Sequence, residues 1–577
     1  MSNNNETPIS SVNETHKSTN QVTLSTHNLF VNKKLFPLLL RFIIPAILVS
    51  IFQALYVFAD QIMMIKFIPQ GTLNPDGLTI ENLVGVNVYQ NYLEALKHLP
   101  GDQVALNTDD LIRAAVSISA PITVILNGVT LLISMGVAVS YAKALGKNDV
   151  NEIEKVWSTG FITNFAVGLF FSLFILAISP VWLKSSATGN GLINSDDPSV
   201  KVFSVAFQEQ QIKLSQGYVY ILSAFNCIQV MTQMYYLLSQ SEGRQLFISL
   251  VPTMCNVLNV VLDYVLIVFG KLALIGSALA TVIGWCINFC AYLTYNQILS
   301  KKHQTYLMLN KLRFGNYQLN LFSVILLIGL ASFLRNSTYS FANSMFQTYL
   351  VNVTTSTHYM PNLTTSPNEF QSIFGSVAPI SNLALQSVWG VIQGGRTVAS
   401  YKYGQKDYRA IKSIYWYVFS IATTYGLIMF SLFSFGLNDF LLTNLFNVSA
   451  EKLAYTSYVL RITMLQVIFL ATGTTAQLYF QATQRVGWSW FSSLVQNIIL
   501  FVPLLFIFEV AANHIAQPNT VQASQEAMNL FILLPSVCTI LAAIINIICS
   551  VIHMYTRMGK EPKTSGFNFI KLKKQKA

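Results

Sequence analysis

The chain has 577 residues, of which 53% are apolar and only 10% charged, and its mean hydropathy is +0.49. Soluble proteins carry about 25% charged residues, so this composition excludes a disordered, collagen-like or disulfide-framework protein and argues against a cytosolic enzyme. The net charge of +11 does not indicate nucleic-acid binding, because cytoplasmic loops of membrane proteins also collect Lys and Arg.

Residues 1–33 are rich in Ser, Thr and Asn and contain no apolar run, which predicts a disordered cytoplasmic tail. Segments long enough to span a bilayer follow, each with the roughly 20 helical residues that this requires. Their apolar runs are continuous, which favours helices over a barrel and predicts an all-α polytopic membrane protein. The twelve segments are 34–67, 113–143, 156–183, 212–240, 246–269, 271–298, 319–350, 374–401, 411–436, 455–482, 488–512 and 529–556.

Basic residues mark one side of the membrane. They gather in both tails and in the loops after even-numbered segments, for example at Lys147, Arg244 and Arg485, whereas loop 68–112 is acidic. We therefore expect a plasma-membrane protein with both termini in the cytoplasm and long outer loops at 68–112 and 351–373. The predicted units are a tail at 1–33, a first lobe at 34–300, a cytoplasmic linker at 301–318, a second lobe at 319–556 and a basic cytoplasmic tail at 557–577.

An internal repeat indicates how the twelve segments are arranged. Residues 120–122 recur as residues 378–380, at an offset of 258. At the same offset Gly136 matches Gly394, Gly146 matches Gly404, and Asp149 matches Asp407. Six crossings separate the copies, so both begin on the same side of the membrane. This predicts two pseudo-symmetric six-helix bundles, as parallel repeats around a central cavity.

Two acids stand deep inside apolar segments of the first lobe, Asp60 in the first segment and Asp263 in the fifth. Each closes a polar set with spacing i, i+3, i+7, which places its three side chains on one helix face. A charge near the bilayer centre costs about 2.5–3.5 kcal/mol, so each acid is a functional candidate. The two sets are Gln53, Tyr56 and Asp60, and Asn256, Asn259 and Asp263.

These acids favour a site for a coupling ion. A carboxylate in a medium of low dielectric takes up a proton readily, and the same oxygens together with Asn259 could instead ligate Na⁺. Asp60, Asp263 and Asn259 are thus the predicted ion site, and they form a metal site only if the ion is Na⁺. The alternative is that the polar faces join helices by hydrogen bonds, and this alternative stays open for Gln53 and Asn256.

Other polar residues could line the cavity. The repeat places Asn343 where the first lobe has Asp60, and Arg335 lies deep in the seventh segment. In the fourth segment Gln229 and Gln233 share one helix face, although helix packing explains them equally well. Arg335 could bind an anionic group or pair with an acid, whereas Arg461 in the tenth segment is expected near a membrane end.

Several motifs are absent from the sequence. There is no P-loop for ATP, no His-Glu-x2-His metal motif and no Gly-x-Ser-x-Gly elbow. We therefore expect no enzyme activity and no cofactor apart from Na⁺ as a coupling ion. The expected partners are a small-molecule substrate and the lipid bilayer, with neither nucleic acid nor ATP.

Taken together, these segments resemble the multidrug and toxic compound extrusion family over about residues 34–556. The resemblance implies a secondary active antiporter that exports cationic drugs, other xenobiotics or metabolites against H⁺ or Na⁺. It also implies the branch with an acid pair in the first lobe, which Asp60, Asn259 and Asp263 match. The similar stretches are 44–61, 140–149, 241–244, 259–263, 276–281 and 394–407.

The sequence departs from other branches of that family, which place acids in helices seven and ten. Here those helices have none, and Arg335 brings a positive charge instead. The alternative function is therefore a flippase for lipid-linked or amphipathic anions from the same wider superfamily. A channel or a membrane scaffold without coupled transport is less favoured.

Overall fold

The computed structural model describes residues 34–71, 108–187, 198–309, 312–356, 368–446, 448, 450–517 and 521–558. The predicted tail at 1–33, most of loop 68–112, much of loop 351–373 and nearly all of the tail at 557–577 lie outside these residues. Each of the twelve predicted segments falls on a long helix or on helices that follow one another closely, so the all-α prediction is confirmed.

The first half of the chain forms six long helical units. They are α2 (Leu35–Gly71), α5 (Thr108–Lys147), α6 (Val150–Ala187), α7 (Pro198–Ser241), α8 (Gln245–Tyr264) with the π-helical turn η2 (Val265–Phe269), and α9 (Ala273–Lys301).

The second half follows the same plan with more interruptions. Its units are α10 (Leu319–Ser356), α11 (Asn368–Ser387) with α12 (Trp389–Gly404), α13 (Tyr408–Ser431) with η5 (Leu432–Gly436), α15 (Ala450–Ala482), α16 (Val486–Leu494) with η6 (Val495–Leu500) and α17 (Phe501–Ala516), and α18 (Val521–Ile532) with α19 (Leu534–Thr556). The short helices η4 (Phe314–Asn316) and α14 (Asn438–Asn444) lie between these units.

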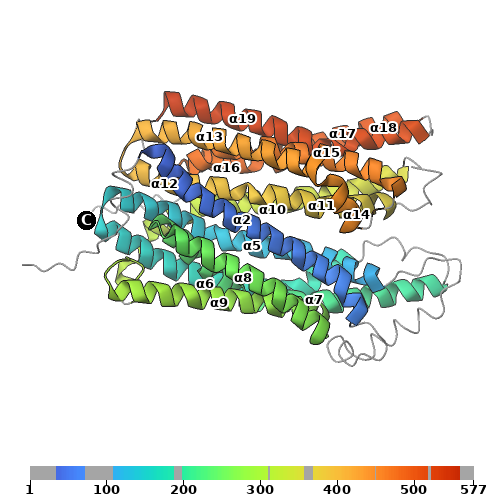
Figure 1. Cartoon of the computed structure of the whole chain (residues 1–577), viewed down its shortest axis with the longest axis horizontal. Helices are drawn as coiled ribbons and strands as arrows, with labels where there is room; N and C mark the ends of the chain where they lie inside the picture. Colours follow the sequence, from blue (N-terminus) through green and yellow to red (C-terminus); the bar gives the residue numbers. More distant parts are fainter. Residues whose placement is uncertain are drawn as a thin grey trace, which may run out of the picture.

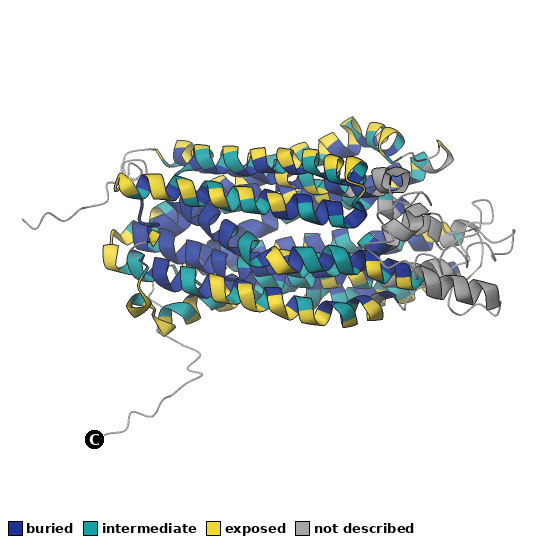
Figure 2. Cartoon of the chain, turned by 90° about the horizontal axis from the view of Figure 1, so that it is seen from below, coloured by how far each residue is buried: buried dark blue, intermediate teal, exposed yellow. Residues whose placement is uncertain are grey.

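The outer surface of the bundle is apolar. Ten stretches of the described helices are long and apolar enough to cross a membrane; the remaining units, α7 and α11–α12, are more polar. Figure 2 shows exposed residues along the outward faces of the helices and buried residues between them. Leu173 and Leu250 are 59% and 57% exposed, which is expected when lipid is the solvent.

The basic turns between helices gather at one end of the bundle, on the left in Figure 1. We call it the basic end and define it by Lys147, Arg244, Lys301, Lys402 and Arg485. Lys143 near the end of α5 donates a 2.6 Å hydrogen bond to Gln484, so turns from the two halves of the chain meet there.

The repeat is visible in two of these turns. Asn148 after α5 and Lys406 after α12 both have left-handed backbones, with φ of 56° and 59°. Asp149 then accepts a hydrogen bond from the backbone N–H of Glu152 (3.1 Å), and Asp407 accepts one from Ala410 (3.0 Å). The repeated Asp is therefore an N-cap, which satisfies a backbone donor that the helix leaves free.

The two halves pack against each other mainly through α5 on α10 and α12, and through α2 on α12 and α11. Glycines allow this approach: a Cβ on Gly136 would lie 1.9 Å from the carbonyl oxygen of Ile325, and one on Gly394 would lie 2.7 Å from Phe42. We call the contact at Gly136, Gly146, Gly394 and Gly404 the interlobe seam. The glycines that mark the repeat are thus the residues at which the halves touch.

The segment after α9 packs against the first half at the basic end. Glu242, which is 1% exposed, accepts hydrogen bonds from the hydroxyls of Tyr141 and Thr305 (both 2.7 Å) and from the backbone N–H of Tyr306 (3.1 Å). Burial raises the pKa of Glu242. This part of the predicted linker is therefore held in place, while the proposed lobe boundaries at 300 and 319 stay a prediction.

Candidate functional site

The two predicted acids come together between α2 and α8. Asp60 is 7% exposed and Asp263 is fully buried, and their carboxyl groups lie close enough to interact. Asp263 stands 18 residues after the start of α8, about 27 Å along the axis from the basic end. The π-helical turn η2 begins two residues later, and such turns are frequent at functional sites.

Helix α9 completes this cluster with two hydroxyls. Ser277 donates a 2.5 Å hydrogen bond to Asp60, and Thr281 bonds Asn259 and Tyr56, each at 3.4 Å. From α7, the phenol of Tyr218 lies within electrostatic range of both acids. We call Asp60, Asn259, Asp263, Ser277 and Thr281 the acid cluster.

Three oxygens in the acid cluster have no hydrogen-bond donor among the described residues. They are both carboxyl oxygens of Asp263 and the amide oxygen of Asn259. Two neighbouring carboxylates repel each other strongly where the dielectric is low, unless a proton or a cation lies between them. The arrangement therefore suits a cation, although no group of three His, Cys, Asp or Glu side chains that could hold a metal ion occurs in the described parts of the chain.

The other predicted cavity residues lie outside the acid cluster. Gln53 on α2 and Asn343 on α10 are exposed, and Asn256 and Gln233 are half-buried. Gln229 donates a 3.1 Å hydrogen bond to Asn127 on α5. Within the described residues no hydrogen bond joins any of these five to Asp60 or Asp263; Tyr56 alone among the cavity predictions bonds a member of the cluster, Thr281.

Arg335 is buried, as its place in the sequence predicts, and is held by the second half of the chain. Its Nη1 donates a 2.5 Å hydrogen bond to Gln477 on α15, and its guanidinium lies 4.5 Å from the ring centroid of Trp389 on α12. A second buried arginine, Arg396 on α12, is near enough for their charges to interact. Arg461 is exposed and donates to the carbonyl of Ser434 (3.2 Å), so it belongs to neither group.

Reasoning from the sequence missed several of these residues. Ser277 and Thr281 stand one helical turn apart in the run 276–281, and that polar pair on a small-residue face is a signal that could have marked them. Arg396 could have been found as an arginine within the predicted segment 374–401, five residues before its end. Tyr218 belongs to the same predicted segment as Gln229 and Gln233, and its place beside the acids depends on how α7 packs against α9.

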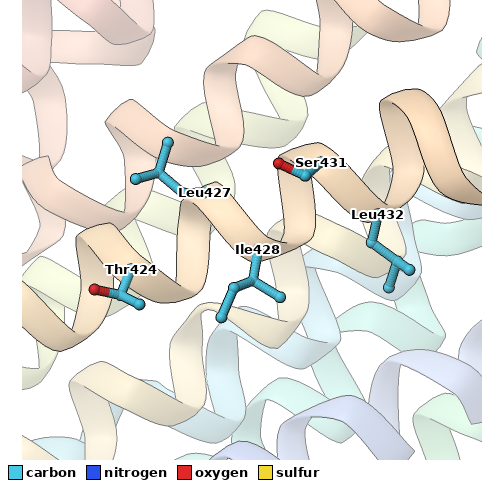
Figure 3. A pocket seen from close by; sticks show the side chains of 5 residues that line it. All are labelled: Thr424, Leu427, Ile428, Ser431 and Leu432. Carbon is cyan, nitrogen blue, oxygen red and sulfur yellow. The ribbon is translucent and has the colours of Figure 1, made fainter.

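A surface hollow lies on α13 and its π-helical extension, and Figure 3 shows the side chains of Thr424, Leu427, Ile428, Ser431 and Leu432 around it. Leu427 and Ile428 are 49% and 56% exposed, so the hollow faces outward. It contains no charged group, and we do not assign it to the functional site.

The chain is similar to several bacterial proteins. It is 47% identical to an uncharacterized protein of Mycoplasmoides gallisepticum over 516 residues, which cover 86% of this chain and 88% of that one. It is 36% identical to an uncharacterized protein of Mycoplasma genitalium over 541 residues, with 92% and 94% covered.

Solved structures share the fold at low identity. A multidrug resistance MATE family transporter of the MOP superfamily, in an outward-facing conformation, superposes with a TM-score of 0.67 at 16% identity and covers 94% of this chain and 99% of its own. A MOP superfamily transporter from Pyrococcus furiosus Vc1, described with a binding pocket of reversed polarity, gives 0.68 at 15% identity, with 92% and 98% covered.

These superpositions confirm the predicted fold of twelve transmembrane helices in two pseudo-symmetric bundles. The family model for MatE matches residues 109–265 and 371–507, one region in each half of the chain. With this match and with full-length relatives above 30% identity, the chain belongs to the MatE family of membrane transporters.

Proposed function

We propose that this protein is a secondary active transporter that exports organic cations or other amphipathic compounds in exchange for H⁺ or Na⁺. The observation that carries the proposal is the buried pair of Asp60 and Asp263, in which both carboxyl oxygens of Asp263 lack a donor among the described residues. A bound cation neutralises the two carboxylates, and release of the cation leaves them repelling each other. The free energy of ion binding is thereby coupled to the positions of α2 and α8.

Helix α2 connects the acid cluster to the contact between the lobes. It carries Asp60 toward one end and packs against α12 toward the other, where a Cβ on Gly390 would lie 2.5 Å from Ala46 and Ile47. A shift of α2 on ion binding would therefore alter the packing between the lobes. Such a change is what alternating access requires.

The acid cluster suits either coupling ion. A proton could be shared by the two carboxyls, while Na⁺ could be ligated by Asp60, Asp263 and the free amide oxygen of Asn259, since hard cations prefer oxygen donors. We further propose that the basic end faces the cytoplasm, that both termini lie there, and that the membrane is the plasma membrane. The acid cluster then lies in the outer half.

Proteoliposomes provide the test. Gradients of pH and of Na⁺ are imposed separately, and uptake of ethidium is followed with the wild-type chain, Asp60→Asn and Glu152→Gln. We expect one gradient to drive uptake by the wild type, Asp60→Asn to insert normally but lose that uptake, and Glu152→Gln to retain it. Glu152 is a suitable control because its ion pair with Lys147 (2.6 Å) lies at the partly exposed basic end.

Unchanged uptake by Asp60→Asn would overturn the ion-site assignment. Wild-type protein that moves no ethidium under either gradient would overturn export of organic cations. The buried arginines favour a second candidate, a transporter of anionic amphipathic compounds such as a flippase, and the reversed polarity described for the Pyrococcus furiosus relative is consistent with it. Labelled anionic lipid that crosses leaflets in the same vesicles would support that function.

A further inference from the structure

Two arginines lie buried in the membrane-spanning part of the second half. Arg335 on α10 is 8% exposed and Arg396 on α12 is 5% exposed. Their charges are near enough to interact. Among the described residues, no carboxylate forms an ion pair with either of them. Two like charges are therefore buried together without a counter-ion in the described part of the chain.

The position of Arg335 is fixed by two neighbouring helices. Gln477 accepts its hydrogen bond at 2.5 Å, and Gln477 in turn donates to Ser493 (3.1 Å), which keeps the amide oxygen turned toward the guanidinium. The ring of Trp389 covers one face. Only one donor of the guanidinium has a protein acceptor in the described part of the chain, so the other donors have no protein partner there.

The guanidinium of Arg396 has weaker hydrogen-bond partners than that of Arg335. Its Nη1 contacts the sulfur of Met135 on α5, which is a weak acceptor from the opposite lobe. Its Nε is buried and has no hydrogen-bond partner among the residues that the structure describes. The next residue, Thr397, bonds Gln240 on α7 (3.4 Å), so this part of α12 also faces the first half. The pair thus lies beside the contact between the lobes.

Energetics argue against a purely structural role. Arg335 stands 16 residues into α10, and an Arg at the bilayer centre costs about 2.5–3.5 kcal/mol even on the gentler scales. Arg396 stands eight residues before the end of α12, and its positive charge adds repulsion to that cost. Gln, Trp and Met do not neutralise that charge. Arg461 provides the contrast, since its side chain is exposed at the surface of the bundle and its Nε donates to the Ser434 carbonyl.

We propose that Arg335 and Arg396 bind a phosphate group of the transported molecule. A phosphate has the charge and the oxygen geometry that two guanidinium groups recognise. Trp389 and Met135 provide apolar surface beside them, which suits an amphipathic molecule. This inference rests on the proposed transport function, because that function makes the space between the lobes the substrate path.

Phenylglyoxal, which modifies arginine side chains, tests the site in the intact protein. The full chain in maltoside detergent is treated alone, with inorganic phosphate, or with phosphatidylglycerol in the micelles, and modification at each Arg is read by mass spectrometry. We expect protection of Arg335 and Arg396 but not of Arg461. Protection by inorganic phosphate indicates a soluble phosphate compound, and protection by the lipid alone indicates a lipid headgroup. Protection by neither, or equal protection of Arg461, overturns the proposal.

Variants test whether the two arginines bind the phosphate together. Arg396→Gln should weaken protection of Arg335 by about 10-fold or more, because one of two charged partners is lost, while Arg461→Gln should leave it unchanged. Should Arg396→Gln fail to fold, the wild-type experiment still decides. Asp60→Asn should keep the protection and lose gradient-driven transport, so failure of the phosphate site and failure of the ion site are distinguishable.

Discussion

Gly146 and Gly404 face each other where α5 and α12 end. A Cβ on Gly146 would lie 2.1 Å from the carbonyl oxygen of Tyr401, and one on Gly404 would lie 2.1 Å from that of Lys143. The helices are therefore in backbone contact, and no other residue fits at either position without displacing a helix. At its basic end the structure is closed between the lobes.

We expect Gly404→Val to open this closed end. Overpacking costs about 1–3 kcal/mol, which shifts a closed-to-open ratio by about 5- to 150-fold. The measurement is maleimide labelling of Ser400→Cys, a position fully buried on α12, read by mass spectrometry. Gly315→Val is the control, because a Cβ there would have no neighbour within 4 Å. Equal labelling in both variants would show that the seam does not restrict access.

Ser277→Ala removes the hydroxyl that donates to Asp60. A hydrogen bond to a charged group contributes about 1.5–3 kcal/mol, so the ionised acid loses stabilisation and would hold the proposed coupling cation more tightly. We expect half-maximal transport at a cation concentration lower by about 10-fold or more. Ser249→Ala is the matched control, since among the described residues that hydroxyl bonds only the Leu246 carbonyl within α8. A shift of the same size in both variants would contradict this role of Ser277.

The helical segments were predictable from the sequence because lipid offers no hydrogen-bond partners. The backbone N–H and C=O groups of a long apolar segment must therefore bond each other within a helix. Breaks inside those segments were not predicted. The interruption at Val388 between α11 and α12 and the π-helical turn η6 (Val495–Leu500) leave the apolar pattern unchanged. They depend on packing between helices, which a single sequence does not report.

The repeated aspartates Asp149 and Asp407 should each contribute to stability as N-caps. Replacing a capping Asp by Ala costs about 1 kcal/mol, so each single variant should lower the melting temperature slightly. No hydrogen bond in the described residues links the two caps, so the double variant should show the sum of the two effects. Asp407→Ser should keep most of the stability, because Ser also caps helices. An unaffected melting temperature in the double variant would exclude a stabilising role.

Glu242→Ala should destabilise the chain by about 3 kcal/mol, because Thr305 and the N–H of Tyr306 lose their buried acceptor.

The stability that Glu242 contributes should also depend on pH, and the sign of this dependence follows from its pKa. Burial raises the pKa of Glu242 above the reference value of 4.5, so the folded state holds the proton more tightly than the unfolded chain. Stability from this group is therefore present below pH 4.5 and lost as the pH rises through the folded pKa.

Melting temperatures of the wild type and Glu242→Gln, measured across that pH range in detergent, check this prediction. The wild type should lose stability relative to Glu242→Gln as the pH increases, because Gln does not titrate. Parallel curves would show that Glu242 does not titrate during unfolding.

For the site, spacing on a helix face was enough to find Asp60, Asn259 and Asp263. The residues that complete each cluster come from other helices, as Ser277 and Arg396 do. Ser277 reaches Asp60 through the packing of α9 on α2, and Arg396 reaches Met135 through the packing of α12 on α5. The periodicity of one segment does not indicate which other segments pack against it. These residues could therefore be assigned to the sites only from the structure.

The acid cluster and the two arginines place opposite charges in opposite lobes. A cation that enters on Asp60 and Asp263 and an anionic group that leaves from Arg335 and Arg396 would both carry positive charge inward. Exchange between them would be electrogenic, and each charge moved is driven by about 2.3 kcal/mol per 100 mV of membrane potential. The distribution of charge between the lobes would therefore let the voltage across the membrane, as well as the ion gradient, power export.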